Sequence, residues 1–364
     1  MRRALQLAAR ADHASSPNPM VGAVVLDRDG RAAGEGFHRR AGEPHAEAEA
    51  LQQAGPRAAG GTLYVTLEPC SHQGRTPPCV EAVLAAGVRR VVAAMEDPDP
   101  RERGAGLARL RAKGVEVAVG VEEAAARRLN RFYIKHRITG RPFVTVKFAI
   151  SLDGRIATAS GESRWITGER SRTEAHRLRQ LHDAILVGAG TVVEDDPKLT
   201  NRLPGATRQP LRVVVDSALR IPAAATVLTG QGGEAPTLVA TTSRAAAAAV
   251  AALESAGAEV LRLGASGPSQ RVDLDELLQE LGRRDVLSLL VEGGAEVHGA
   301  FFDAGLVDAV VAFLAPVVIG GEKAPPAVAG AGVAQLADAF RLHDVQIARL
   351  GDDLMISGDV HRDR

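Results

Sequence analysis

The sequence of 364 residues predicts an α/β fold in two domains. Segments with strand-like and helix-like patterns alternate along most of the chain, and such alternation is typical of sheets covered by helices. Hydrophobic residues make up 45% of the chain and aromatic residues only 3%. The cores must therefore be built from Ala, Val and Leu, which suffices at this length.

In the first half, apolar runs predict strands and helical spacing predicts the helices between them. Asp29-Gly30 is expected to form a hairpin turn, and Pro44 to open a helix, because Pro is favoured in a first helical turn. The expected strands cover 21–26, 34–38, 63–67, 88–94 and 115–119, and the expected helices 1–14, 44–54, from 77 onward, 104–113 and 122–131. This half is predicted to be an α/β layer sandwich.

The second half begins after a polar segment, 137–141, which precedes Pro142 and is expected to be a linker. The predicted domains are therefore 1–141 and 142–364. Expected strands in the second domain cover 143–150, 183–187, 211–215, 286–291, 307–314 and 354–360, with helices at 169–181, 244–256 and 296–304. The Gly-Gly turn after 286–291 is either a phosphate-facing turn or simply a tight turn.

His45, Glu47, Cys70 and Cys79 predict a metal centre in the first domain. One imidazole and two thiols suit Zn²⁺, and three protein ligands leave a fourth position open, as in catalytic zinc sites. Water in that position becomes a nucleophile near neutral pH. His-x-Glu followed by Pro-Cys-x-x-Cys is the signature of zinc nucleobase deaminases, with the Glu as proton carrier. Here eight residues separate the cysteines instead of two.

A single disulfide is the alternative explanation for the two cysteines. It is disfavoured because no secretory signal precedes them and a His-x-Glu lies upstream.

Charge and hydropathy argue against nucleic acid and membrane partners. Lys and Arg number 44, and so do Asp and Glu, which gives no overall attraction to nucleic acid or an anionic membrane. The longest apolar run, 309–319, is too short to cross a bilayer. We expect a cytoplasmic enzyme that binds small molecules.

Three motifs of the first half carry a family resemblance. They are Asn18-Pro19-x-Val21-Gly22, His45-Ala46-Glu47 and Pro69-Cys70-x-His72-x-Gly74-Arg75-Thr76-Pro77-Pro78-Cys79. Together they resemble the deaminase half of the RibD family of bifunctional riboflavin biosynthesis proteins, in which the long spacing between the cysteines is typical.

This resemblance implies a cytidine-deaminase-like α/β/α sandwich and a substrate, 2,5-diamino-6-ribosylamino-4(3H)-pyrimidinone 5′-phosphate. Glu47 would act as general base and then acid. The residues implied to hold the pyrimidinone and its ribose phosphate are Asn18, His38, His72 and Arg75. The alternatives are that Asn18 is only a turn residue and His38 only a structural one.

Four motifs of the second half resemble the reductase domain of the same family, which has a dihydrofolate-reductase-like fold. They are Val146-Lys147-x-Ala149-x-Ser151-Leu152-Asp153-Gly154, Ser163-x-Trp165-Ile166-Thr167, Gly188-x-Gly190-Thr191-Val192-x-x-Asp195-Asp196-Pro197 and Val291-Glu292-Gly293-Gly294. The implied reaction is hydride transfer from NADPH to C1′ of the ring-opened ribose. Domains of this type usually pair, so a homodimer or higher homo-oligomer is expected through this domain.

The resemblance also assigns residues in the reductase half. Those implied to contact NADPH are Ala149, Trp165, Thr191, Asp195, Ser217 and the turn that begins at Gly294. Those implied to contact the substrate are Ser163, Arg179, Leu199, Arg202 and Glu292. Arg179 and Arg202 are plausible phosphate ligands, although an Arg in an Arg-rich chain is usually a surface residue.

Two other functions remain as alternatives. One is a chain with only one active half, and the other is a nucleic-acid-acting zinc deaminase or a zinc-stabilised binding module. Neutral charge and few aromatic side chains for base stacking oppose the second.

Overall fold

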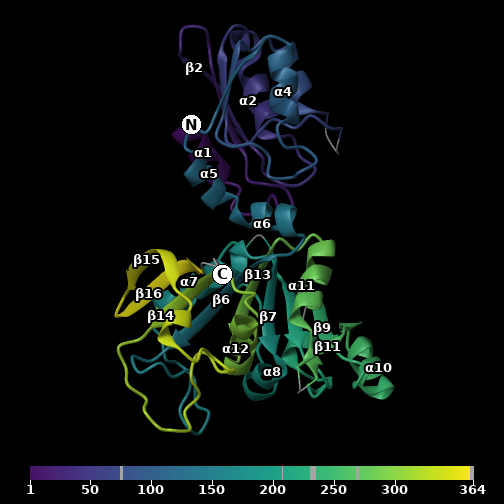
Figure 1. Ribbon diagram of the computed structural model, residues 1–364, viewed down its shortest axis with the longest axis vertical. Coiled ribbons are helices and arrows are strands. Elements are labelled where there is room, and N and C mark those ends of the chain that lie inside the picture. The colour runs from purple at the N-terminus through teal and green to yellow at the C-terminus, as the bar shows by residue number, and fades with distance from the viewer. Residues whose placement is uncertain (74–76, 207, 230–234, 268–269, 361–364) are drawn as a thin grey trace. The chain divides into compact units, whose positions relative to one another are not determined.

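The computed structural model describes residues 1–73, 77–206, 208–229, 235–267 and 270–360. The chain divides into two compact units, Met1–Arg141 and Pro142–Arg364. Each unit has its own sheet, with helices packed against it (Figure 1). The predicted α/β class is therefore confirmed in both units.

The sheet of the first unit has the strand order β2-β1-β3-β4-β5. Strand β1 is antiparallel to β2 and β3, and the remaining neighbours are parallel. The strands are β1 (Gly22–Leu26), β2 (Ala32–Phe37), β3 (Thr62–Val65), β4 (Arg90–Ala93) and β5 (Glu116–Val119). The helices are α1 (Arg2–Ala9), α2 (Ala46–Ala54), η1 (Gly55–Ala58), α3 (Cys79–Ala85), α4 (Ala105–Ala112), α5 (Glu123–Leu129) and α6 (Arg131–Thr139).

Helix α2 lies unusually close to strand β2. A Cβ on Gly34 would stand 2.1 Å from the carbonyl oxygen of Ala50, and one on Gly36 would stand 2.4 Å from that of Ala46. Only glycine permits this approach, because any side chain would collide with the helix backbone. The close packing fixes the start of α2, where two of the predicted site residues lie.

The prediction of a linker over 137–141 is wrong for residues 137–139, which are helical. Helix α6 runs through Thr139 and ends at Gly140, whose positive φ of 68° is typical of a helix terminus. Its residues Phe132, Tyr133 and His136 are buried. These buried contacts favour a helix that runs into the segment whose polar composition predicts a linker.

The main sheet of the second unit has the order β10-β9-β8-β7-β13-β6-β14-β16-β15. Neighbours from β10 to β14 are parallel, and β16 and β15 complete the sheet in antiparallel fashion. The strands are β6 (Phe143–Ile150), β7 (Ala184–Gly188), β8 (Leu211–Val215), β9 (Thr237–Thr241), β10 (Glu259–Arg262), β13 (Ser288–Gly293), β14 (Ala309–Leu314), β15 (Leu342–Leu350) and β16 (Asp353–Val360). The short strands β11 (Ala265–Ser266) and β12 (Arg271–Val272) pair with each other.

Alternating side chains of this sheet enter two different cores. Val144, Leu186 and Leu289 pack on one face, while Ile185 and Leu290 pack on the other. Such alternation follows from the two-residue period of a strand and lets helices cover both faces. The helices are α7 (Glu169–Leu181), α8 (Ala189–Asp195), α9 (Thr226–Thr229), α10 (Ala247–Ser255), α11 (Leu274–Arg283), α12 (Ala295–Asp303) and η2 (Leu336–Asp338).

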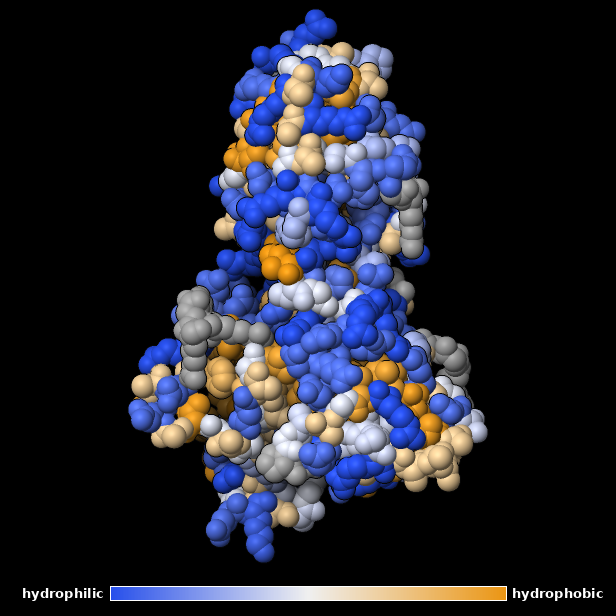
Figure 2. Space-filling view, turned by 45° about the vertical axis from the view of Figure 1, so that its right-hand side comes forward, coloured by the Kyte–Doolittle hydropathy of each residue, from blue (hydrophilic) through white to orange (hydrophobic). Residues whose placement is uncertain are grey.

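Among the described residues, no helix combines the length and the apolar character needed to cross a membrane. Figure 2 shows a face on which hydrophilic residues predominate and apolar residues form small patches.

Candidate functional site

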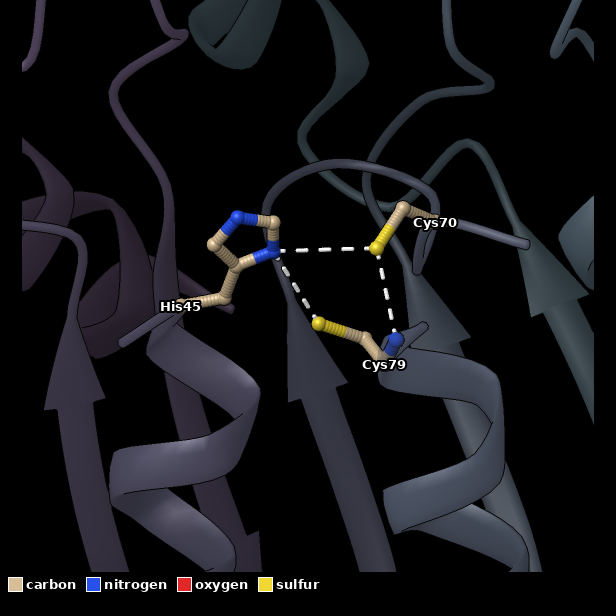
Figure 3. Close-up of side chains that lie close together, drawn as sticks. All are labelled: His45, Cys70 and Cys79. Carbon is tan, nitrogen blue, oxygen red and sulfur yellow. Dashed lines mark hydrogen bonds between the residues drawn. The ribbon is translucent and has the colours of Figure 1, made fainter. Parts of the chain in front are cut away.

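His45, Cys70 and Cys79 come together in the first unit (Figure 3). His45 is the residue before helix α2, Cys70 follows strand β3, and Cys79 is the first residue of α3. His45 Nδ1 lies 3.2 Å from Cys79 Sγ and 3.6 Å from Cys70 Sγ. All three candidate ligand atoms lie within 4.8 Å of one another.

These separations fit a tetrahedral zinc ion. Bonds of about 2.0 Å to nitrogen and about 2.3 Å to sulfur place tetrahedral N and S ligands roughly 3.5 Å apart. The distances from His45 Nδ1 to the two sulfur atoms lie on either side of that value. The three side chains therefore match both the ligand types and the spacing that zinc requires.

The two thiols differ in how readily they lose a proton. Hydrogen bonds from Cys79 and from His45 lower the pKa of Cys70, whose sulfur also accepts the main-chain N–H of Cys79 at 3.3 Å. The neighbouring Cys70 sulfur and burial raise the pKa of Cys79. Cys70 is therefore the first of the pair to become a thiolate, the form that binds metal.

Glu47 lies in the first turn of α2 and is only 3% exposed. Burial raises the pKa of its carboxyl to about 7, although the charge of His45 acts in the opposite direction. Cys79 is among its hydrogen-bonding neighbours. The carboxyl is thus beside the predicted ligands and suited by its pKa to take up and release a proton near neutral pH.

Asn18 and His38 form a chain of hydrogen bonds next to His45. Asn18 Nδ2 lies 3.0 Å from His38 Nε2, and His38 Nδ1 lies 3.1 Å from the carbonyl oxygen of Pro44. The carbonyl can only accept, so His38 donates from Nδ1 and accepts from Asn18. The rings of His38 and His45 meet edge to face, 5.1 Å between centroids. Burial lowers the pKa of His38, which favours this neutral form.

His72 lies beside Glu102, which had not been predicted. His72 Nδ1 is 3.0 Å from Glu102 Oε2, and the Ser71 hydroxyl donates to the same oxygen at 3.2 Å. Arg75, a predicted phosphate ligand, lies outside the described residues.

The segment that carries Glu102 is held by a buried carboxylate, Glu68. Its two oxygens accept four main-chain N–H groups, those of Asp97, Gly104, Gly106 and Leu107. A buried carboxylate requires such partners to offset its lost hydration. Glu68 therefore joins the end of β3, which leads to Cys70, to the start of α4.

Four residues predicted to bind a cofactor lie at one edge of the second sheet. Ala149, Thr191, Ser217 and Gly294 are at or just beyond the carboxyl ends of β6, β7, β8 and β13. Because these strands are parallel neighbours, their carboxyl ends meet at the same edge. Figure 1 shows α8 and α12, which follow β7 and β13, at that end.

The turn after β13 approaches α8 closely. A Cβ on Gly293 would stand 2.9 Å from Thr191 Oγ1, and Gly294 has a φ of +83° that strongly favours glycine. The two strand-to-helix turns are therefore packed together, with their helix N-termini side by side.

The segment that carries Trp165 is joined to Asp195 through Arg164. The guanidinium of Arg164 donates to the carbonyl oxygen of Asp195 at 2.7 Å, and Arg172 lies over the Trp165 ring, 4.7 Å from its centroid. The Trp165 side chain is 69% exposed. Ser163, two residues earlier, is half-buried.

A cluster of charged side chains surrounds Glu292 at the end of β13. Arg179 on α7 donates to both carboxylate oxygens, at 2.8 and 2.7 Å, and Lys147 Nζ on β6 lies 3.7 Å away. Burial acts to raise the pKa of Glu292, but the charges of Arg179 and Lys147 outweigh it and lower the pKa to about 2. Arg202 and His176 adjoin the cluster.

Three cations and one carboxylate leave this cluster with an excess of positive charge. Lys147 stands in the motif that begins at Val146 but has no role implied by the resemblance, and His176 lies outside the motifs. Leu199, a predicted substrate contact, is only 3% exposed and packs in the core.

Family models match both units. The model of the RibD C-terminal domain matches residues 142–356, and that of the cytidine and deoxycytidylate deaminase zinc-binding region matches residues 1–95. The second match contains His45, Cys70 and Cys79, so the deaminase-like unit has its zinc site at these residues.

Full-length relatives and solved structures are similar to the whole chain. Riboflavin biosynthesis protein RibD of Bacillus amyloliquefaciens is 42% identical, covering 100% of this chain and 99% of that protein. RibD of Acinetobacter baumannii has a TM-score of 0.87 at 36% identity, covering 99% of this chain and 98% of its own. A Thermotoga maritima diaminohydroxyphosphoribosylaminopyrimidine deaminase/5-amino-6-(5-phosphoribosylamino)uracil reductase has a TM-score of 0.79 at 34% identity, covering 99% and 97%.

Proposed function

The chain belongs to the RibD family of bifunctional deaminases and reductases in riboflavin biosynthesis, and we propose that it acts on pyrimidine ribose phosphates in two consecutive steps. The first removes an amino group from 2,5-diamino-6-ribosylamino-4(3H)-pyrimidinone 5′-phosphate. The second reduces the ribosyl chain of the resulting uracil to ribityl. The observation that carries this proposal is the pairing of an open His-Cys-Cys site and buried Glu47 with a full-length match to both halves.

In the deaminase step, His45, Cys70 and Cys79 would hold zinc, which when bound makes an activated water available near neutral pH. Glu47 takes a proton from the water that adds to the ring carbon bearing the 2-amino group. It then returns the proton to the departing ammonia, leaving an oxo group on that carbon. The burial of Glu47 and its pKa of about 7 support this double role.

The substrate of this step would be oriented by residues around the metal ligands. Asn18 and His38 are assigned to the pyrimidinone, because their hydrogen-bonded pair is beside His45. His72 and Arg75 are assigned to the ribose phosphate. Glu102 would hold the His72 ring in one orientation.

In the reductase step, NADPH when bound supplies the hydride that C1′ of the ring-opened imine receives. Ala149, Thr191, Ser217 and Gly294 would bind it along the carboxyl edge of the sheet. Asp195 at the end of α8, and Trp165, whose neighbour Arg164 bonds to Asp195, are assigned to it as well. The protein's part is to bring the two reactants together, since the hydride comes from the cofactor.

The substrate of the reductase would be held at the charged cluster. Arg179 and Arg202 would bind its phosphate, for which guanidinium groups offer forked hydrogen bonds. Glu292, Ser163 and Leu199 are assigned to the rest of the molecule, although Leu199 is buried in this structure. The excess of cations around Glu292 supports an anionic substrate.

We also infer that the reductase unit forms a homodimer or higher homo-oligomer. Strand β15 is the last strand of its sheet, and such edges favour pairing with another chain. On this hairpin Ile347 pairs with Ile356, and Ile347 is 68% and Leu354 37% exposed.

The decisive experiment follows the diaminopyrimidinone ribose phosphate by mass spectrometry, with and without NADPH, for the native chain and Glu47→Gln. With the native chain, the substrate should exchange its amino group for an oxo group without NADPH. The product should gain two hydrogens only when NADPH is present. Glu47→Gln should keep its zinc, lose deamination by about 10²- to 10⁴-fold, and still reduce pre-deaminated substrate. If the substrate keeps its mass after incubation with zinc-loaded native chain, the substrate assignment is refuted.

A further inference from the structure

Side chains of helix α7 form hydrogen bonds with three successive residues of the segment that carries Arg202. Arg179 Nη1 donates to the carbonyl oxygen of Thr200 at 2.9 Å. Gln180 Oε1 accepts from the buried side chain of Asn201. His176 Nδ1 accepts the main-chain N–H of Arg202 at 3.3 Å. Arg179 and Gln180 are three and four residues after His176, so all three lie on one face of α7.

His176 is the neutral member of a charged surrounding. Arg179, Arg202, Glu292 and Lys147 all act on it electrostatically. Burial, followed by the charges of Arg179 and Arg202, lowers the pKa of its imidazole to about 4. The ring is therefore uncharged near pH 7, with the Nδ1 lone pair available to the Arg202 amide and the proton on Nε2.

The two arginines of the cluster, Arg179 and Arg202, are held in different ways. The Arg179 guanidinium is oriented by Glu292 and Thr200. Arg202 is exposed, and its main-chain N–H donates to His176 Nδ1. A flexible Arg gains binding strength when its backbone is fixed, because less conformational freedom is lost when the ligand arrives.

We propose that His176 is a positioning residue of the reductase, which holds the main chain of Arg202 beside Arg179 so that both guanidinium groups face one phosphate. The inference rests on the proposed function of these two arginines. It predicts that His176 affects affinity for the phosphorylated pyrimidine, while the hydride step and NADPH binding are independent of it.

The test compares His176→Phe, which keeps a ring but removes the acceptor, with His176→Asn, whose Oδ1 can accept at the position of Nδ1. Thr173→Ala, on the exposed side of α7, is the matched control. His176→Phe should raise the KM for 5-amino-6-(5-phosphoribosylamino)uracil about fivefold, the change expected for loss of one main-chain hydrogen bond. The kcat and the KM for NADPH should stay within twofold, and His176→Asn should restore most of the loss.

Two further measurements separate positioning from a general structural effect. On the same pyrimidine without its phosphate, His176→Phe and the native chain should have equal KM. In an Arg202→Ala background, which alone should raise KM roughly tenfold or more, His176→Phe should add nothing. Melting temperatures and deaminase activity of each preparation report on folding.

The outcomes distinguish the inference from the function beneath it. If Arg202→Ala raises KM but His176→Phe does not, the positioning role is refuted while the phosphate site stands. The same holds if the KM increase of the double variant is the product of the two single increases. A lower kcat at unchanged KM, or an equal loss on the unphosphorylated pyrimidine, also refutes it. If Arg202→Ala leaves KM unchanged, the assigned phosphate site is wrong and the inference falls with it.

Discussion

At the scale of single residues, Glu292 shows how a buried carboxylate is kept ionised. Its two oxygens are each paired with Arg179, and Lys147 adds a second cation at 3.7 Å. A buried ion is tolerated only with partners of this kind, and removing one partner leaves the other charge uncompensated. Glu292 is therefore both a candidate substrate contact and a stabilising group of the second unit.

Glu292→Gln should destabilise this unit in a way that depends on pH. The pKa of Glu292 is lowered to about 2 from 4.5, so its stabilising contribution is complete above pH 4.5 and is lost as pH falls toward 2. The native chain should lose about 2 kcal/mol from this group by pH 3. Hydrogen exchange of peptides from β13 and α7, measured between pH 6 and pH 3, gives the local stability.

At pH 6 the Glu292→Gln protein should be the less stable, by about 3 kcal/mol, because Arg179 is left buried without a counter-charge. The difference between the two proteins should shrink as pH falls. A difference that is constant over this range would contradict the role of the ionised carboxylate. Glu254→Gln, on α10 and exposed, serves as control.

Sequence reasoning worked best for residues that share a short motif. His45, Glu47, Cys70 and Cys79 were identifiable because residue types and spacing together specify zinc chemistry. His176 and Glu102 were not, because their partners Arg202 and His72 are 26 and 30 residues away in the chain. A lone His or Glu carries no local signal of such a contact.

At the scale of elements, the sequence predicted long or strongly apolar segments well and weakly patterned ones poorly. Helix α7 matches its predicted span of 169–181, and β6 and β8 match theirs. Helix α8 was missed because it begins with Ala-Gly directly after a strand, where glycine disfavours helix. Helix α11, absent from the predicted elements, does carry a local signal, because Asp273 accepts the N–H groups of Asp275 and Glu276 as an N-cap.

Strand β15 was missed because it is exposed on both faces and so lacks an alternating pattern. Its exposure yields a prediction about assembly. Ile347→Lys should shift the native chain toward monomer, because a charge replaces an apolar side chain at the inferred interface. The folded monomer should be almost unaffected, since the site is 68% exposed. Light scattering coupled to gel filtration measures the mass.

Gln346→Lys introduces the same residue one position earlier, where the side chain points to the other face of the strand. It should leave the mass as in the native chain. A native chain that is already monomeric at micromolar concentration would rule out the inferred interface.

At the scale of the whole molecule, the zinc site and the charged cluster around Glu292 lie in separate compact units. All three zinc ligands lie within Met1–Arg141, and the charged cluster around Glu292 lies within Pro142–Arg364. Each unit has its own sheet and core, which is the condition for independent stability. The polar segment 137–141 before Pro142 is the signal from which the boundary is predicted, whereas the helical character of most of that segment depends on buried contacts.

Removal of zinc by a chelator should therefore abolish deamination and leave reduction intact. With pre-deaminated substrate and NADPH, the treated protein should retain its reductase rate within about twofold, while its first unit becomes less stable for want of a bound ligand. The measurement is the deaminase rate and the reductase rate before and after chelation, and readdition of zinc is the control. Loss of both activities together would mean that the units depend on each other.

The chain has two cysteines, and both belong to the zinc site. A thiol-reactive dye added to the native protein has no other sulfhydryl to modify, so its uptake reports on one centre alone. Because a bound metal lowers the reactivity of a thiolate and Cys70 is the less buried of the two, faster labelling of Cys70 indicates molecules without metal. Protein purified from any source can thus be graded for occupancy before a rate is measured.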